Sequence, residues 1–273
     1  MYKVQYRGLA GDGFSPKIWS KVKLLEMLMD NALGYVNADE FLSFGGVVTS
    51  NVGSYASQGG AYKSFETTSC AISQLDTVAG GAITLLSNGA DNDTMVFERG
   101  YGNGGSFLYT AGTGKRLYYE TRIRPNAAWD VSAAKDLFVG LITKGMSAAG
   151  TTLFSNTAGT MTGAGVNAIG FTLLNSGSAL KTCLQKGAVA RTPVAAATLV
   201  AGTWVKLGFY VNHEDPTYQL RYFVNNVQVD AVADTNSAFP TALQLVEAFA
   251  LKLQASDAGA GLDLDWYRCA QER

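Results

Sequence analysis

The sequence predicts a mainly β fold in which two antiparallel sheets pack face to face, and three observations predict it. Apolar and polar residues alternate with a period of two in many short runs, as in strands with one buried side. Gly is abundant (31) and Pro is scarce (5), so small, turn-forming residues separate the runs. About twelve or thirteen such runs fit a β-sandwich of the jelly-roll kind, preceded by an arm and one amphipathic helix.

The amino-terminal part, residues 1–60, differs in pattern from the rest and is expected to form an arm, a helix and a tether. The helix is predicted over residues 15–33, where Ser15 can cap it, Pro16 suits its first position and Gly34 can end it. Two alternatives are open for its apolar stripe: packing on the sheet of its own domain, or docking on a neighbouring subunit. Residues 37–62 are expected to be a loop with one short strand.

Residues 61–273 are expected to form the sandwich itself. The charged outer face of residues 116–124 indicates a half-exposed strand, and the apolar run 136–143 indicates a strand covered on both sides. Residues 243–253 have helical propensity, but we predict a strand because they follow a β meander. The predicted strands are 82–86, 94–98, 107–110, 116–124, 136–143, 168–174, 180–185, 204–211, 218–224, 227–230, 243–253 and 262–269.

The clearest hairpin lies in residues 218–230. Asn225 and Asn226 separate its two strands, and Asn tolerates the left-handed backbone of a two-residue hairpin turn. Such a turn sets a register that pairs apolar residues with each other and a positive with a negative charge. The expected cross-strand pairs are Val224 with Val227, Tyr222 with Val229, and Arg221 with Asp230.

Composition excludes several classes of protein. The net charge is −1 and only 16% of the 273 residues are charged, so nothing indicates a general binder of nucleic acids or acidic membranes. No run approaches the roughly 18 apolar residues of a membrane span, and the start lacks a signal-peptide core. We therefore expect synthesis in a cytoplasm without a lipid anchor. The cysteines, Cys70, Cys183 and Cys269, are expected to be buried thiols.

Carboxylates are the first catalytic candidates in this fold, because a retaining glycosidase needs two of them about 5–5.5 Å apart. Asp263 and Asp265 share a strand face, but Glu98, Glu120 and Glu247 each stand alone. The expected role of the two aspartates is an outward-facing polar strand. The chain is therefore predicted not to be an enzyme.

Metal and sugar sites have weaker signals. A Ca²⁺ site is conceivable around His213, Glu214 and Asp215, or at residues 91–93, but such acids usually serve the turn itself, and no cofactor is expected. Three aromatic residues are candidates for stacking on sugars, with a place in the core or rim as the alternative for each: Tyr101, Tyr118 and Trp129.

Residues 61–273 resemble the concanavalin A-like jelly-roll modules found in tailed-bacteriophage virion proteins. The resemblance is carried by RLYYETRIRP, DLFVGLI, AIGFTLL, AGTWVKLGFYV, QLRYFVNNVQV and the closing LDLDWYR. The earlier stretches KSFETT, GGAITLL and DNDTMVFERG are similar to the opening of such modules. The same fold serves lectins, laminin G-like modules and glucanases, so the resemblance implies the fold more directly than the role.

The resemblance implies a non-enzymatic virion protein that decorates or cements the outer surface of a phage capsid. Its expected partners are the major capsid protein and further copies of itself, a trimer being plausible, after synthesis in the host cytoplasm. The candidate contact residues are Trp19, Val22, Leu25 and Leu28. The alternative is a carbohydrate-binding, lectin-like module for attachment to a host surface or glycan, and a third hypothesis is an unusual glycosidase.

Overall fold

The computed structural model describes most of the chain beyond residue 14. The described residues are 15–20, 22, 26–27, 30, 32–41, 44–49, 52–57, 60–66, 70–75, 81–87, 89–99, 109–111, 114–147, 153–154, 161, 165–241, 243–254 and 257–273.

Within these residues the chain forms the short helix α1, two further helical residues at Glu26 and Met27, and nineteen strands. The helix and strands are α1 (Pro16–Trp19), β1 (Gly34–Asp39), β2 (Phe44–Thr49), β3 (Val52–Ser57), β4 (Gly60–Glu66), β5 (Ala71–Gln74), β6 (Ile83–Leu86), β7 (Thr94–Arg99), β8 (Tyr109–Ala111), β9 (Leu117–Pro125), β10 (Lys135–Thr143), β11 (Asn167–Ser176), β12 (Ala179–Lys186), β13 (Val189–Ala190), β14 (Ala195–Thr198), β15 (Val205–Val211), β16 (Leu220–Val224), β17 (Val227–Val232), β18 (Leu243–Leu253) and β19 (Gly261–Glu272).

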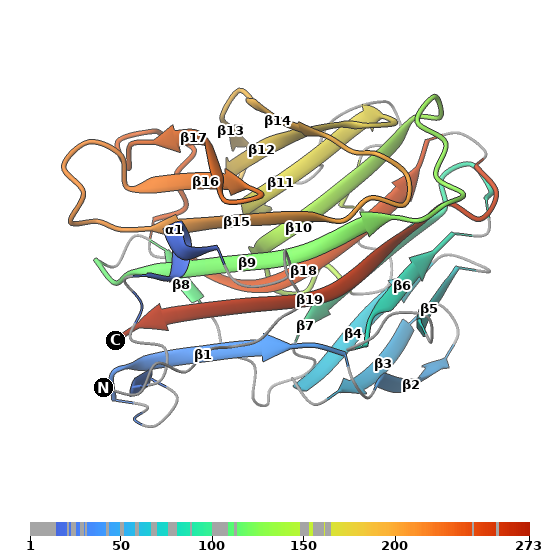
Figure 1. Cartoon of the computed structure of the whole chain (residues 1–273), viewed down its shortest axis with the longest axis horizontal. Coiled ribbons are helices and arrows are strands. Elements are labelled where there is room, and N and C mark those ends of the chain that lie inside the picture. The colour runs from blue at the N-terminus through green and yellow to red at the C-terminus, as the bar shows by residue number, and fades with distance from the viewer. Residues whose placement is uncertain are drawn as a thin grey trace.

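The strands form two large antiparallel sheets that lie one behind the other (Figure 1). The first sheet has the order β17-β16-β15-β9-β19-β6-β5, with β1 paired to the other end of β19. The second has the order β13-β12-β11-β10-β18-β7-β4-β3-β2, with β14 on β12 and β8 on β18. The predicted two-sheet sandwich is confirmed, and residues 243–253 are the strand that we expected rather than a helix.

The sandwich begins earlier in the chain than predicted. The expected tether contains β1, β2 and β3, which belong to the sheets, so the boundary at residue 60 does not separate an arm from the sandwich. Gly34 to Asp39 pair with the last residues of β19. Sequence alone missed these strands because their Gly, Ser and Asn residues also favour loops, whereas strand pairing depends on distant partners.

The main core lies between the two sheets, and alternation along the strands decides which residues enter it. Val205, Leu207, Phe209 and Val211 of β15 are all buried there, as predicted. A second apolar cluster covers the outer face of the larger sheet, where Leu153 and Phe154 of a connecting segment pack over β7, β10 and β18. Strand β10 is therefore covered on both sides, as its continuous apolar run predicted.

The predicted hairpin forms, but its register is correct only next to the turn. Val224 pairs with Val227, and Asn225 and Asn226 have φ of 47° and 66°. A bulge between Tyr222 and Phe223 then shifts the pairing, so Tyr222 lies opposite Asp230. The predicted Arg221–Asp230 pair is wrong: Arg221 binds Asp215 at 2.6 Å, and Asp230 pairs with Arg191. Bulges of this kind cannot be read from alternation.

The predicted helix over residues 15–33 is also wrong in its extent. Helix α1 ends at Trp19 and Val22 is not helical, but the backbone is helical again at Glu26 and Met27. Its start is as predicted, with Ser15 before the helix and Pro16 at its first position. Figure 1 shows α1 lying on the outer side of β9 and β15. Among the described residues, none forms a helix long and apolar enough to cross a membrane.

Candidate functional site

The outer face of the first sheet carries a group of polar and aromatic side chains, which we call the Trp204 strip: Trp204, Arg122, Arg124, Asp263 and Asp265. Trp204 directly precedes β15, whose Val205 pairs with Ile123 of β9, so its indole lies beside Arg124. Arg124 is in turn paired with Asp263 of β19. Residues that are distant in sequence therefore lie in one row across three strands.

The two arginines hold the strip together. The Arg124 Cζ atom lies 4.4 Å from the centroid of the Trp204 ring, and the Arg122 Cζ atom lies 4.7 Å from it. Guanidinium groups at this distance from an indole attract its π face. Arg124 donates from Nε and Nη2 to Asp263 Oδ2 at 2.8 and 2.7 Å. Arg122 donates from Nη1 to Asp265 Oδ2 at 2.6 Å. Each side chain in the strip is therefore fixed by a neighbour.

A bulge in β19 lies at Asp265, beside the arginines. The pairing of β9 with β19 shifts between Leu264 and Trp266, so Asp265 is an extra residue on its strand. Alternation along the strand places Asp263 and Asp265 on the same face, and the bulge leaves Trp266, not Asp265, opposite Arg122. Asp263 and Asp265 are buried, whereas Arg122 and Arg124 are half-buried. The acids thus lie below and the cations above, closer to solvent.

The strip combines an aromatic surface with balanced charges. Two guanidinium groups face two carboxylates, and Trp204 remains half-buried rather than covered. An aromatic face supports an apolar surface of a ligand, and fixed donors and acceptors beside it select hydroxyl groups. Because each aspartate is paired with an arginine, the strip presents fixed charged groups beside an aromatic ring.

The amino-terminal segment covers the neighbouring part of the same face. Trp19 donates from Nε1 to Glu120 Oε2 at 2.7 Å, and the Ser15 backbone N–H lies 3.1 Å from the same oxygen. Burial raises the pKa of Glu120, and the hydrogen bonds from Ser15 and Trp19 oppose that rise. Ile18 and Trp19 are buried against this sheet, and Val22 packs beside them. Of the candidate contact residues, Trp19 thus lies inside its own domain.

The other two candidates for capsid or subunit contact, Leu25 and Leu28, lie outside the described residues. Of the four candidate contact residues, Trp19 and Val22 are therefore the two that the structure describes. Both contact the chain's own sheet, which is the alternative that the sequence left open.

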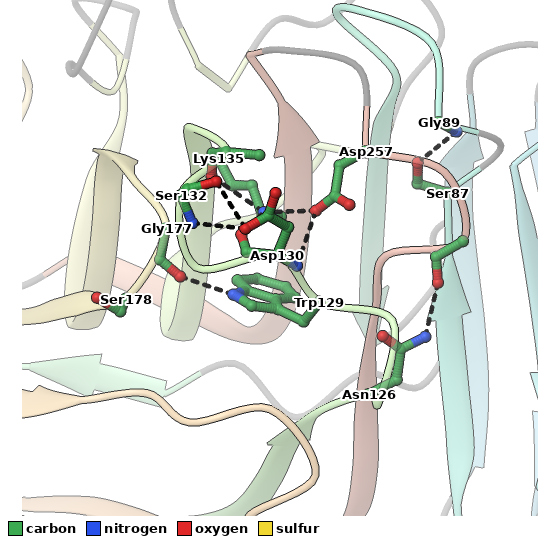
Figure 2. A network of polar contacts seen from close by, with 12 residues as sticks. Ser87, Gly89, Asn126, Trp129, Asp130, Ser132, Lys135, Gly177, Ser178 and Asp257 are labelled. Carbon is green, nitrogen blue, oxygen red and sulfur yellow. Dashed lines mark hydrogen bonds and ion pairs between the residues drawn. The ribbon is translucent and has the colours of Figure 1, made fainter.

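A network of polar contacts fixes the loops at the end of the sandwich next to the strip (Figure 2). Trp129 donates from Nε1 to the Gly177 carbonyl at 2.6 Å. The Lys135 ammonium lies 2.5 Å from Asp257 Oδ2 and donates to the Asp130 carbonyl at 2.6 Å. These contacts join the loops after β9, β11 and β18. They hold the ends of β9 and β19, from which the strip projects.

Two of the three candidates for stacking on sugars, Trp129 and Tyr118, are buried. Trp129 is 3% exposed and Tyr118 is 2% exposed, so neither offers a free ring face. Burial also raises the pKa of Tyr118 to about 12. Tyr101 lies outside the described residues.

The acidic turns satisfy their own backbone. Asp215 accepts hydrogen bonds from the Thr217 and Tyr218 backbone N–H groups, both at 3.0 Å, and Glu214 pairs with Arg116. Asp93 accepts from the Ala90 N–H at 3.2 Å. In the part of the chain that the structure describes, no three His, Cys, Asp or Glu residues are grouped as metal ligands.

Sequence reasoning missed Trp204 as a site residue, although the signal was present. Alternation along residues 204–211 already placed Trp204 and Lys206 on the outer face of their strand, away from the core. The sequence also predicts the charged outer face of residues 116–124 and the outward-facing position of the two aspartates, Asp263 and Asp265. What the sequence did not reveal is that β15, β9 and β19 are neighbours, which brings these groups together.

Comparison with known proteins identifies the fold. No family model matches the chain, and no curated protein matches it. Among solved structures, a protein of unknown function from Shewanella oneidensis MR-1 has a TM-score of 0.54 at 12% identity, over 88% of this chain and 87% of that one. The carbohydrate recognition domain of Emp47p has a TM-score of 0.53 at 11% identity, over 88% and 97%.

An endo-1,3-β-glucanase from Streptomyces sioyaensis is similar to the same degree, with a TM-score of 0.50 at 10% identity over 89% of this chain and 97% of the enzyme. A lectin-type domain and a glucanase thus share this architecture, and at such identities the likeness concerns the fold alone. The chain has a concanavalin A-like jelly-roll fold.

Proposed function

We propose that the protein is a non-catalytic carbohydrate-binding module whose ligand lies on the Trp204 strip. The observation that carries the proposal is the half-buried indole of Trp204, held by two arginines that are themselves paired with aspartates. The likeness to the Emp47p domain, which is described as a carbohydrate recognition domain, supports the proposal at the level of the fold.

The chemistry of the strip suits a sugar. One face of a pyranose ring is lined with C–H groups, which pack on the exposed part of the Trp204 ring. A guanidinium has five N–H donors, and Arg124 uses only its Nε and Nη2 atoms toward Asp263. We propose that its Nη1 donors bind sugar hydroxyls beside the Trp204 ring.

The arrangement of carboxylates supports binding rather than hydrolysis. Asp263 and Asp265 lie on one strand, and each is bound to an arginine, at 2.7 and 2.6 Å. The three single glutamates lie on three different faces. Glu98 binds the Gly145 and Ser147 N–H groups, Glu120 lies under α1, and Glu247 binds Asn37 between the sheets. A glycosidase pair needs two acids across one cleft.

Capsid decoration stays a prediction, together with the major capsid protein as partner, a trimer and a virion location. The proposed contact through Trp19 would require that residue to leave its present place, where it is 8% exposed. Binding to undecorated capsids, measured beside glycan binding with the same protein, compares the two functions directly.

The proposed function is tested by replacing Trp204. We expect Trp204→Ala to weaken binding of glycans found on an array by about tenfold or more in calorimetry, corresponding to about 1.4 kcal/mol. Tyr218→Ala is the matched control, because Tyr218 is an exposed aromatic that also lies beside an arginine, Arg221, but away from the strip. Equal affinity of wild type and Trp204→Ala, or absence of any glycan ligand, would contradict the proposal.

A further inference from the structure

We propose that a second sugar subsite, continuous with the Trp204 strip, lies beneath residues 15–19, and that this segment occupies it as an internal ligand. The inference rests on the proposed function and deepens it. It predicts that the ligand is a chain of several sugar units, and that the amino-terminal segment must be displaced for the whole chain to bind.

The floor of this subsite is aromatic. Tyr118 of β9 and Tyr210 of β15 are directly paired, with ring centroids 6.2 Å apart. Phe223 of β16 stacks on Tyr210 at 5.7 Å. The three rings form a row across neighbouring strands on the outer face, and the indole of Trp19 stacks on Tyr118 at 6.1 Å. A row of rings on a sheet face offers the same kind of surface as Trp204.

The polar group of the subsite is Glu120. Its carboxylate receives the indole N–H of Trp19 and the backbone N–H of Ser15, so the segment presents donors to it as sugar hydroxyls would. Glu120 and Arg122 are two residues apart on β9 and point to the same face. They are therefore about 7 Å apart along the strand. A ligand on the strip thus reaches Glu120 without leaving the face.

The segment is fitted to the face by side-chain packing and by hydrogen bonds. A Cβ atom added to Gly208 would lie 2.4 Å from Ile18 Cδ1, so the glycine makes room for Ile18. The helix has four residues, too few to be stable by itself in water. Its position therefore depends on Ile18, Trp19, the bonds to Glu120 and the bond from the Lys17 N–H to Asn226 Oδ1, and a ligand that replaces these contacts can displace it.

The experiment releases the segment and measures the binding of oligosaccharides of increasing length. Ile18→Asp places a charge in the space that Gly208 leaves for Ile18. Trp19→Ala removes the stacked indole without changing the sheet. Lys17→Asp is the matched control, because Lys17 is on the same helix but exposed. Hydrogen exchange of residues 16–20 reports whether the segment has been released.

We expect both release variants to speed hydrogen exchange in residues 16–20, to bind a long oligosaccharide at least about fivefold more tightly than wild type, and to bind the shortest ligand unchanged. Adding Glu120→Gln to Ile18→Asp should remove the gain. Faster exchange with no gain for any length overturns the subsite while leaving the Trp204 proposal intact. Exchange unchanged in both variants overturns it too, because the segment would then not depend on these contacts. Loss of binding in Trp204→Ala is scored separately and concerns the proposed function alone.

Discussion

Lys135 Nζ lies 2.5 Å from Asp257 Oδ2, and both side chains are buried where the loops after β9 and β18 meet. The same ammonium donates to the carbonyls of Asp130 and Ala133 and lies 4.8 Å from the centroid of the Trp129 ring. A single cation thus satisfies three acceptors from two loops. It joins segments that are more than a hundred residues apart.

Lys135→Met should lower the free energy of unfolding by about 3–5 kcal/mol, because it leaves the Asp257 carboxylate buried without its cation. Urea denaturation measures the change. Lys181→Met is the control, since Lys181 is an exposed lysine on the same sheet, and its effect should stay within about 0.5 kcal/mol. Equal effects of the two substitutions would contradict a structural role for the buried pair.

Gly177→Ala should destabilise the same end of the sandwich by about 1–3 kcal/mol. An added Cβ would lie 1.8 Å from the Val131 carbonyl oxygen, so the loop after β9 must move and the bond from Trp129 to the Gly177 carbonyl must lengthen. Gly165→Ala is the control, because nothing lies within 4 Å of its added Cβ. Thermal denaturation of both variants, with near-ultraviolet circular dichroism of Trp129, checks the prediction.

Trp204 should dominate the quenching of tryptophan fluorescence by acrylamide. The other three tryptophans, Trp19, Trp129 and Trp266, are at most 8% exposed, whereas Trp204 is half-buried. We expect Trp204→Phe to lower the quenching constant at least about twofold, and a bound sugar to have the same effect on wild type. Quenching that is the same in wild type and Trp204→Phe would show that the Trp204 ring is covered.

Docking of residues 15–19 should strengthen as the pH falls. Burial raises the pKa of Glu120 above its usual 4.5, so the docked state binds the proton more tightly than the undocked state. Stability contributed by this group is present at low pH and is lost as the pH rises from about 4.5 through the raised pKa. Hydrogen exchange of residues 16–20, corrected for its intrinsic pH dependence, should therefore slow toward acid pH.

Glu120→Gln is the control for this dependence. It cannot ionise, so the corrected exchange of residues 16–20 should no longer vary with pH between about 4.5 and 7. If wild type shows no variation either, or varies in the opposite direction, the carboxylate of Glu120 is not what couples docking to pH.

Alternation in the sequence was enough to predict the sandwich, because it reports which side of a strand is buried. It correctly assigned the inner face of β15 and the double coverage of β10. It failed where the structure depends on an irregularity. The bulge beside Tyr222 moved the partner of Arg221, and the bulge at Asp265 placed Trp266, rather than Asp265, opposite Arg122. A bulge adds one residue without leaving a compositional trace.

The site was harder to predict than the fold because it depends on strand order. Trp204, Arg124 and Asp263 are neighbours only because β15, β9 and β19 are adjacent, although they are far apart in the sequence. The helix shows a related limit. Periodicity indicated an apolar stripe, but it could not show that Trp19 lies over a carboxylate of its own sheet.

The length and direction of β19 have a practical consequence. Gly34 lies opposite Glu272, the last residue of β19, whereas Asp263 lies near the strand's other end. Nine residue steps along the extended strand lead from Asp263 to Glu272, a span of about 30 Å. A protein immobilised through a tag after Arg273 would therefore present Trp204 at the end remote from the sensor surface, accessible to even a bulky polysaccharide.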